Sequence, residues 1–176
     1  VVGLIEKPEH ITTQWFKDAG DVILGRRCLA CGHLGRPMCV ACCAGAVSPY
    51  RHDAGHWVAG PYDGHLRAAI LGYKEHGCLA LDAALGSMLA IAVLALARGQ
   101  SPGVLRLVPV PSHRRSRRER GFDAVGRIAA RAAQALVSTG LDVAVSRSLV
   151  MARDYERHSA GSAAGRTLVA GAFRGD

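Results

Sequence analysis

Apolar residues recur at helical spacing in three stretches of the chain. In residues 62–77 they fall three or four positions apart, which is typical of an amphipathic helix. Residues 79–98 are apolar on nearly every side and therefore predict a central, buried helix. A third helix is predicted from Gly121 to about Val137. Its apolar face consists of Val125, Ile128, Ala129, Ala132 and Leu136.

Two apolar runs between and after these helices have the character of strands. Residues 104–111 end in proline, and residues 141–150 follow the third helix. The polar segment 113–120 between the first run and Gly121 is predicted to be a loop. The alternation of helix, strand, loop, helix and strand predicts an α/β fold with parallel strands. Weaker patterns predict an amphipathic helix within 11–24 and an Ala/Gly-rich helix at 159–173.

Residues 25–60 differ in composition from the rest of the chain. They hold five of the six cysteines and show little periodicity, so a large apolar core cannot stabilise them. The whole chain has 176 residues, which is enough for one domain and a small appendage. The sequence predicts an N-terminal helical segment at 1–24, a small lobe at 25–60 and an α/β domain at 61–176.

Two Cys-x-x-Cys pairs in the small lobe indicate a metal site. Each pair turns two thiolates toward one point, and two pairs supply the four sulfurs of a tetrahedral zinc site. The predicted ligands are Cys28, Cys31, Cys39 and Cys42. A redox-active dithiol and unligated thiols are the alternatives. Zinc at this position would be structural, because it would stabilise a lobe too small to build its own core.

Three other residues bear on this site. His33 and Cys43 lie close enough in sequence to be substitute ligands, but the adjacent Cys42 and Cys43 cannot easily direct both sulfurs at one metal. Cys42 is therefore the expected ligand. Cys78 lies alone between two predicted helices and is expected to be a small buried apolar residue.

The net charge of +8 is confined to the second half of the chain. Residues 1–88 carry 8 basic and 8 acidic side chains, whereas residues 89–176 carry 14 basic and 6 acidic ones. Arginine outnumbers lysine by 19 to 3. Because the planar guanidinium group binds two phosphate oxygens at once, this excess favours a phosphate-bearing partner.

Five arginines lie in the predicted loop at 113–120. The loop is predicted to leave the carboxyl end of a strand and to enter a helix, which is where open α/β sheets bind ligands and where helix amides face anions. The sequence therefore predicts a phosphate site here, with a solvated basic loop or a nucleic-acid-binding patch as the alternative. His113 flanks the loop and is a weak candidate for a general base.

The sequence also bears on location. The first eleven residues do not have the form of a secretory signal. The longest uncharged apolar stretch, residues 83–97, is shorter than the roughly 18 to 20 residues that span a bilayer. Six cysteines in such a chain are expected to be reduced or metal-bound. A cytoplasmic location without membrane insertion is expected.

Three blocks of the sequence resemble the ComF family of competence-type proteins, also called GntX-like. They are the double Cys-x-x-Cys lobe, residues 62–77 and residues 108–123. The most specific matches are the Pro-Val-Pro at 109–111 and the Arg-Glu-Arg-Gly-Phe at 118–122, and the resemblance covers about residues 11–173. It implies a zinc ribbon joined to a type I phosphoribosyltransferase-like domain with a parallel sheet.

The resemblance also implies a ligand. A protein of this family is expected to bind 5-phosphoribosyl 1-pyrophosphate (PRPP) or a nucleotide, with Mg²⁺ shared with the pyrophosphate. Basic residues would neutralise charge on the pyrophosphate leaving group. The matching phosphate- or substrate-binding positions are Lys74, Arg118, Arg120, Gly121 and Phe122.

The sequence departs from the family pattern at several positions. Asp123 stands where the family usually has Asn, and His158 and Val169 stand where it usually has Gln and Asn. The acidic pair and Thr/Gly-rich turn that hold ribose 5-phosphate in type I phosphoribosyltransferases do not occur before Asp176. The chain is therefore expected to end before its PRPP loop, which leaves open whether it is an active transferase.

Two further hypotheses belong to other classes. The family's association with DNA uptake implies a module that binds single-stranded DNA and a helicase-like partner. Phe122 is the one aromatic residue within the arginine-rich segment, which counts against an autonomous single-strand binder. Alternatively, the chain folds only with a partner, because a sheet that lacks later strands exposes an edge.

Overall fold

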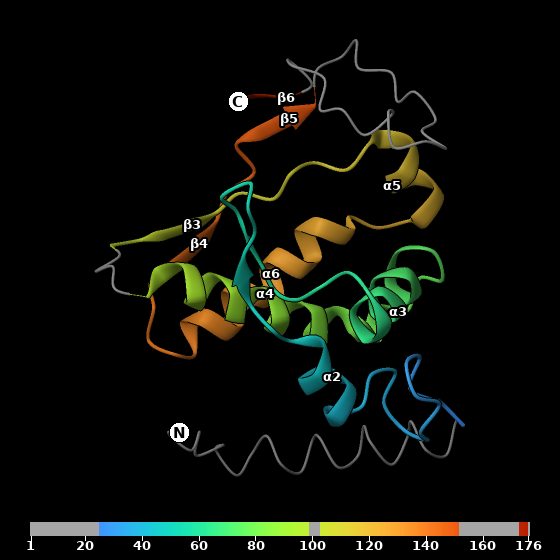
Figure 1. Cartoon of the computed structure of the whole chain (residues 1–176). Helices are drawn as coiled ribbons and strands as arrows, with labels where there is room; N and C mark the ends of the chain where they lie inside the picture. Colours follow the sequence, from blue (N-terminus) through green and yellow to red (C-terminus); the bar gives the residue numbers. More distant parts are fainter. Residues whose placement is uncertain (1–24, 99–102, 152–172, 176) are drawn as a thin grey trace.

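The structure is a computed structural model that describes residues 25–98, 103–151 and 173–175 (Figure 1). The helix expected within 11–24 and nearly all of that expected at 159–173 lie outside these residues. The elements in chain order are α2 (Val40–Ala46), β1 (Tyr50–Arg51), β2 (Trp57–Val58), α3 (Gly64–Lys74), the 3-10 turn η1 (Leu79–Leu81), α4 (Asp82–Ala97), β3 (Leu105–Leu107), α5 (Arg114–Arg120), α6 (Ala124–Val137), β4 (Val143–Val145), β5 (Leu149–Met151) and β6 (Phe173–Gly175).

Helices α4 and α6 pack along each other at the centre of the fold (Figure 1). Buried residues occur on several sides of α4, which confirms the prediction of a central helix. The two backbones approach closely at Gly86, where an added Cβ would lie 2.3 Å from the Cβ of Arg131 and 3.1 Å from the backbone nitrogen of Ala132. The helix pair therefore depends on a residue without a side chain at this position.

Replacing Gly86 with alanine is expected to lower the free energy of unfolding by about 1 to 3 kcal/mol, because the facing atoms belong to or adjoin the backbone of α6 and cannot move aside. The matched control is Gly45→Ala in α2, where the added Cβ meets only the ring of His65, 3.2 Å from its Nδ1. Urea denaturation of both variants measures the difference. Equal stabilities would contradict the close approach of α4 and α6.

Three two-stranded sheets accompany the helices. Strands β3 and β4 are parallel, with Leu105 opposite Val143 and Leu107 opposite Val145, and one face of this pair packs on α4 and α6. Strands β1 and β2 pair antiparallel, as do β5 and β6. The prediction of a mixed α/β fold containing parallel strands is confirmed.

The prediction of one strand over residues 141–150 is wrong. This run forms two strands, β4 and β5, which pair with different partners. The polar sequence Ser-Arg-Ser at 146–148 separates them, and the N–H of Ser146 donates to the carbonyl of Leu107 (2.9 Å) where the pairing with β3 ends. The apolar run is therefore divided at the point where its pairing partner changes.

The core consists of two clusters. The larger cluster joins residues of the cysteine lobe, such as Met38, to Leu66 and Tyr73 of α3 and to Leu85 of α4. The smaller lies between α4, α6 and the β3–β4 pair. The cysteine lobe at 25–60 thus shares its core with the helices that follow it.

One stretch of the described residues, Leu79–Ala97, is long and apolar enough to cross a membrane by length and composition. It comprises η1 and α4, and 44% of its most apolar window is buried inside the structure. Core helices of soluble proteins have the same properties, so this stretch is weak evidence for a membrane span.

Candidate functional site

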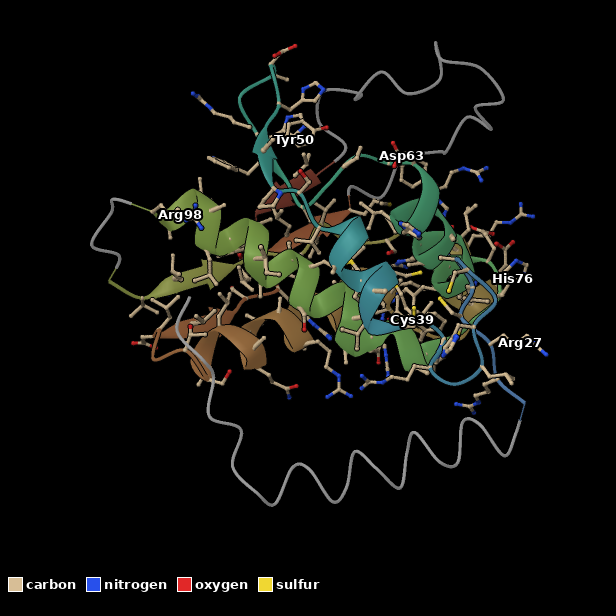
Figure 2. The ribbon with its side chains drawn as sticks, turned by 60° about the horizontal axis from the view of Figure 1, so that its bottom comes forward. Arg27, Cys39, Tyr50, Asp63, His76 and Arg98 are labelled. Atoms are coloured by element: carbon tan, nitrogen blue, oxygen red, sulfur yellow. The ribbon has the colours of Figure 1, made fainter. Side chains whose placement is uncertain are left out.

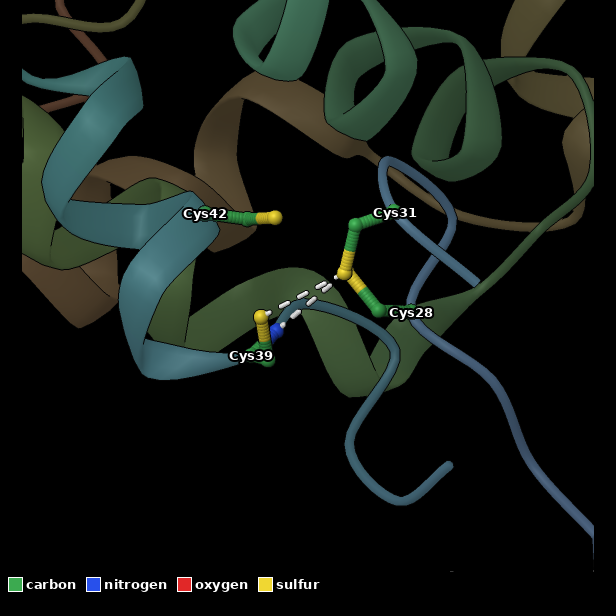
Figure 3. Close-up of side chains that lie close together, drawn as sticks. All are labelled: Cys28, Cys31, Cys39 and Cys42. Carbon is green, nitrogen blue, oxygen red and sulfur yellow. Dashed lines mark hydrogen bonds between the residues drawn. The ribbon is translucent and has the colours of Figure 1, made fainter. Parts of the chain in front are cut away.

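The four predicted cysteines lie together next to α2. Cys28 and Cys31 belong to the turn before this helix, Cys39 is its N-cap residue, and Cys42 lies within it. All four sulfurs lie within 4.8 Å of one another and face a common centre (Figure 3). The prediction that these residues form one cluster is confirmed, and the cluster can hold a metal ion.

Local backbone geometry explains how the first pair is formed. The N–H of Cys28 donates to the carbonyl of His33 (2.8 Å), and the N–H of Gly32 donates back to the carbonyl of Cys28 (2.8 Å). Gly32 has a φ of 74°, a left-handed conformation that glycine adopts without a steric penalty. This tight turn brings the thiol of Cys31 back over that of Cys28.

The electrostatic environment differs between the two buried thiols. Burial alone would raise the pKa of Cys28, but backbone hydrogen bonds, led by that of the Cys39 N–H (3.5 Å to Sγ), lower its pKa to about 6. Burial and the neighbouring thiols raise the pKa of Cys42. Burial opposes the ionisation of several thiols in one place. A divalent cation bound among the four sulfurs would favour their thiolate form.

The residues that flank the cluster are not part of it. The thiol of Cys43 points to the carbonyl of Met38 (3.8 Å), and burial raises its pKa. Among the described residues the four-sulfur group contains Cys42 and excludes both Cys43 and His33. Cys78 is half-buried and packs against the larger core cluster, in general agreement with its expected apolar role.

The segment predicted to be a loop at 113–120 is instead the helix α5. Its amino end is capped by His113, whose Nδ1 accepts a hydrogen bond from the N–H of Arg115 (3.2 Å). Glu119 pairs with Arg115 one turn away (2.7 Å), and arginine and glutamate are good helix formers. The loop prediction is wrong because these local interactions stabilise a helical turn.

The start predicted for the following helix is also wrong. Gly121 was expected to open that helix, but it has a φ of 75° and ends α5 as a left-handed C-cap. Helix α6 begins at Ala124 after the N-cap Asp123, whose Oδ1 accepts from the N–H of Gly126 (3.3 Å). The Asp at position 123 was the sequence signal that could have identified this boundary.

Helix α5 exposes four arginines, of which Arg115 pairs with Glu119. The other three, Arg114, Arg117 and Arg118, make no ion pair with another residue in the described part of the chain. Arg118 is thus the one predicted phosphate-binding arginine that faces solvent. Arg114 and Arg117 were not among the predicted site residues, although they belong to the same charged run.

Of the other predicted phosphate-binding residues, Arg120 and Phe122 hold α5 against α3, and Gly121 ends α5. Arg120 is partly buried: its Nε donates to the carbonyl of Lys74 (3.0 Å), and its Nη2 lies 4.0 Å from a carboxylate oxygen of Glu75. The N–H of Gly121 donates to the carbonyl of Arg117 (2.9 Å). The ring of Phe122 meets that of Tyr73 edge to face, with centroids 5.2 Å apart. Arg120, Gly121 and Phe122 therefore have structural contacts in this conformation, and their ligand-binding role stays a prediction.

Sequence reasoning missed a buried polar cluster beneath this contact. The hydroxyl of Tyr73 and the guanidinium of Arg127 both donate to the carboxylate of Asp82, with Arg127 Nε 3.0 Å from Oδ2. Burial alone would raise the pKa of Asp82, but these hydrogen bonds and the arginine charge outweigh it and hold the pKa below its usual value. Burial and the Asp82 carboxylate raise the pKa of Tyr73. The cluster ties α3, α4 and α6 together.

Comparisons of this chain with protein-family models, with curated proteins and with solved structures found no match.

Proposed function

We propose that this chain is a ComF-like protein of the phosphoribosyltransferase class that binds a phosphorylated ligand, PRPP or a nucleotide, through the arginines of α5. The observation that carries the proposal is the exposed set Arg114, Arg117 and Arg118, which follows a strand of a parallel pair. Several arginines on one short helix present paired donors suited to phosphate oxygens. The resemblance of residues 62–77 and 108–123 to the ComF family supports the same ligand class.

We further propose that the cysteine cluster holds a structural zinc ion. Four sulfur ligands in a closed set, two of them buried, are the donor set of structural rather than catalytic zinc. Zinc in this lobe would contribute folding energy. Mg²⁺ is proposed only together with a bound pyrophosphate. A cytoplasmic location is proposed because the thiols would remain reduced there.

The triple variant Arg114→Gln, Arg117→Gln, Arg118→Gln is expected to weaken PRPP binding about 100-fold, because each lost guanidinium removes charge-assisted hydrogen bonds to phosphate. Isothermal titration calorimetry with Mg²⁺ measures the change. The matched control removes three charges elsewhere on the exposed surface, through Arg51→Gln, Arg67→Gln and Arg98→Gln. Equal losses in both variants would show that net charge, rather than α5, governs binding.

A single-stranded DNA-binding module is the second candidate, and the exposed arginines of α5 are compatible with it. Its weakness is the position of Phe122, whose ring packs on Tyr73 and is engaged in the core contact rather than presented as a stacking surface. Affinity for an oligonucleotide that falls steeply with salt, together with no Mg²⁺-dependent PRPP binding, would favour this candidate over the first.

A further inference from the structure

We propose that the carboxyl end of α3 couples the cysteine cluster to α5, so that a metal ion bound by the cluster positions α5 and strengthens its binding of anions. The inference rests on the proposed function for the anion-binding role of α5. Figure 1 shows α3 between α5 above it and, below it, α2 and the blue cysteine turn that precedes α2. In Figure 2, Arg27 and Cys39 of the lobe lie at the same end of the molecule as His76, which follows α3, and Arg98 lies at the other end.

The first contact joins the cysteine lobe to α3. Leu29 lies between the two ligands Cys28 and Cys31, and its Cδ1 occupies the space above Gly72, where an added Cβ would lie only 2.3 Å from it. The N–H of Leu29 donates to the carbonyl of Pro37 (2.9 Å), which fixes the turn that carries this side chain. Because a bound metal would hold both flanking cysteines, it would also fix where Leu29 meets α3.

The second contact joins α3 to α5. Tyr73 and Lys74 directly follow Gly72, and they receive the two contacts that anchor the carboxyl end of α5: the Phe122 ring on Tyr73 and the Arg120 Nε on the carbonyl of Lys74. Tyr73 is fully buried and also donates to Asp82, so its ring has little freedom to move independently of α3. Consecutive residues of α3 thus link the two parts: Gly72 faces the cysteine lobe, and Tyr73 and Lys74 contact the end of α5.

In this scheme Arg120 is a positioning residue. The two arginines nearest to it on α5, Arg117 and Arg118, are exposed, and the orientation of α5 decides where their guanidinium groups point. Anchoring α5 lowers the conformational entropy lost when these side chains bind an anion. Loss of the metal should free Leu29, loosen the end of α3 and reduce this preorganisation.

The experiment compares the full chain with bound zinc and after chelation, using two readouts. The first is the affinity for ribose 5-phosphate, which unlike pyrophosphate does not chelate zinc strongly. We expect about a tenfold loss of affinity on zinc removal and, by thermodynamic reciprocity, about tenfold tighter zinc binding in saturating ribose 5-phosphate. The second is hydrogen exchange of the α5 amides, which should accelerate without zinc by a larger factor than that of residues 132–136 in α6.

Two matched variants locate the coupling. Leu29→Ala removes the side chain above Gly72 and is expected to keep the zinc. In this variant zinc removal should change the affinity for ribose 5-phosphate by less than about twofold. Leu34→Ala removes a leucine of similar exposure in the same lobe, 46% against 47%, and should leave the coupling unchanged. Equal behaviour of the two variants would overturn the proposed route.

The outcomes separate this inference from the proposed function. If the zinc-bound chain binds neither ribose 5-phosphate nor PRPP, the proposed function fails, and hydrogen exchange alone then decides whether zinc positions α5. Unchanged exchange of α5 on zinc removal overturns the coupling even where anion binding is intact. A loss of protection in residues 132–136 as large as that in α5 also overturns it, because the change in α5 would then follow from the lower stability of the whole fold alone.

Discussion

Cys42→Ser is expected to abolish stoichiometric zinc binding and to lower the free energy of unfolding by more than about 4 kcal/mol, the range typical of the loss of a metal or a disulfide. Cys42 is 4% exposed and supplies one of the four clustered sulfurs, and its neighbours Met38 and Cys28 belong to the larger core cluster. For a chain of this length the change corresponds to a fall in Tm of about 10 °C. Metal analysis and thermal denaturation measure the two effects.

Cys43→Ser is the matched control, because it makes the same chemical change at the adjacent residue. The thiol of Cys43 is directed toward the carbonyl of Met38 rather than into the cluster. This variant should keep one equivalent of zinc and lose at most about 1 kcal/mol of stability. Zinc retention by Cys42→Ser, or zinc loss by Cys43→Ser, would contradict the ligand set.

Asp82→Asn is expected to lower the free energy of unfolding by about 2 to 3 kcal/mol. The Asp82 side chain is 5% exposed and accepts hydrogen bonds from Tyr73 and Arg127. Breaking a fully buried ion pair costs about 3 to 5 kcal/mol. The cost here should be smaller, because the Arg127 side chain is 43% exposed and can turn toward water. Urea denaturation at neutral pH measures the change.

The pH dependence gives this prediction a second readout. The folded pKa of Asp82 lies below its usual value, so the ionised carboxylate stabilises the fold above the unfolded pKa of about 3.9. That contribution is lost as the pH falls from there through the folded pKa. The stability difference between the wild type and Asp82→Asn should therefore shrink on acidification. Asp63→Asn, at an exposed carboxylate whose side chain caps no helix amide, should show neither effect.

The fold was predictable where the information is local. The repeating apolar positions at 62–77 and the uniformly apolar run at 79–98 correctly predicted α3 and α4. The spacing of the cysteines correctly predicted their clustering, because two Cys-x-x-Cys turns restrict the geometry strongly. In each of these cases the residues that decide the structure lie within one or two turns of chain.

The sequence did not predict the features that depend on contacts between distant segments of the chain. The polar residues 146–148 divide the run 141–150, but nothing local shows that its first part pairs with β3 and its second with β6. Asp82 borders an apolar run and looks like a residue that ends it, yet it is buried because Tyr73 and Arg127 reach it from two other helices. Likewise, nothing in the sequence near Arg120 shows that its Nε donates to the carbonyl of Lys74, a residue 46 positions away.

The close approach of α4 and α6 limits how this sequence can diverge. Gly86 faces Arg131 and Ala132 with no room for a side chain, and Ala90 and Ala132 occupy the adjoining core. The exposed arginines of α5 are under no comparable packing restriction. A distant relative that preserves the helix pair should therefore retain its spacing of small residues longer than its pattern of charge, and that spacing is the better sequence marker of common ancestry.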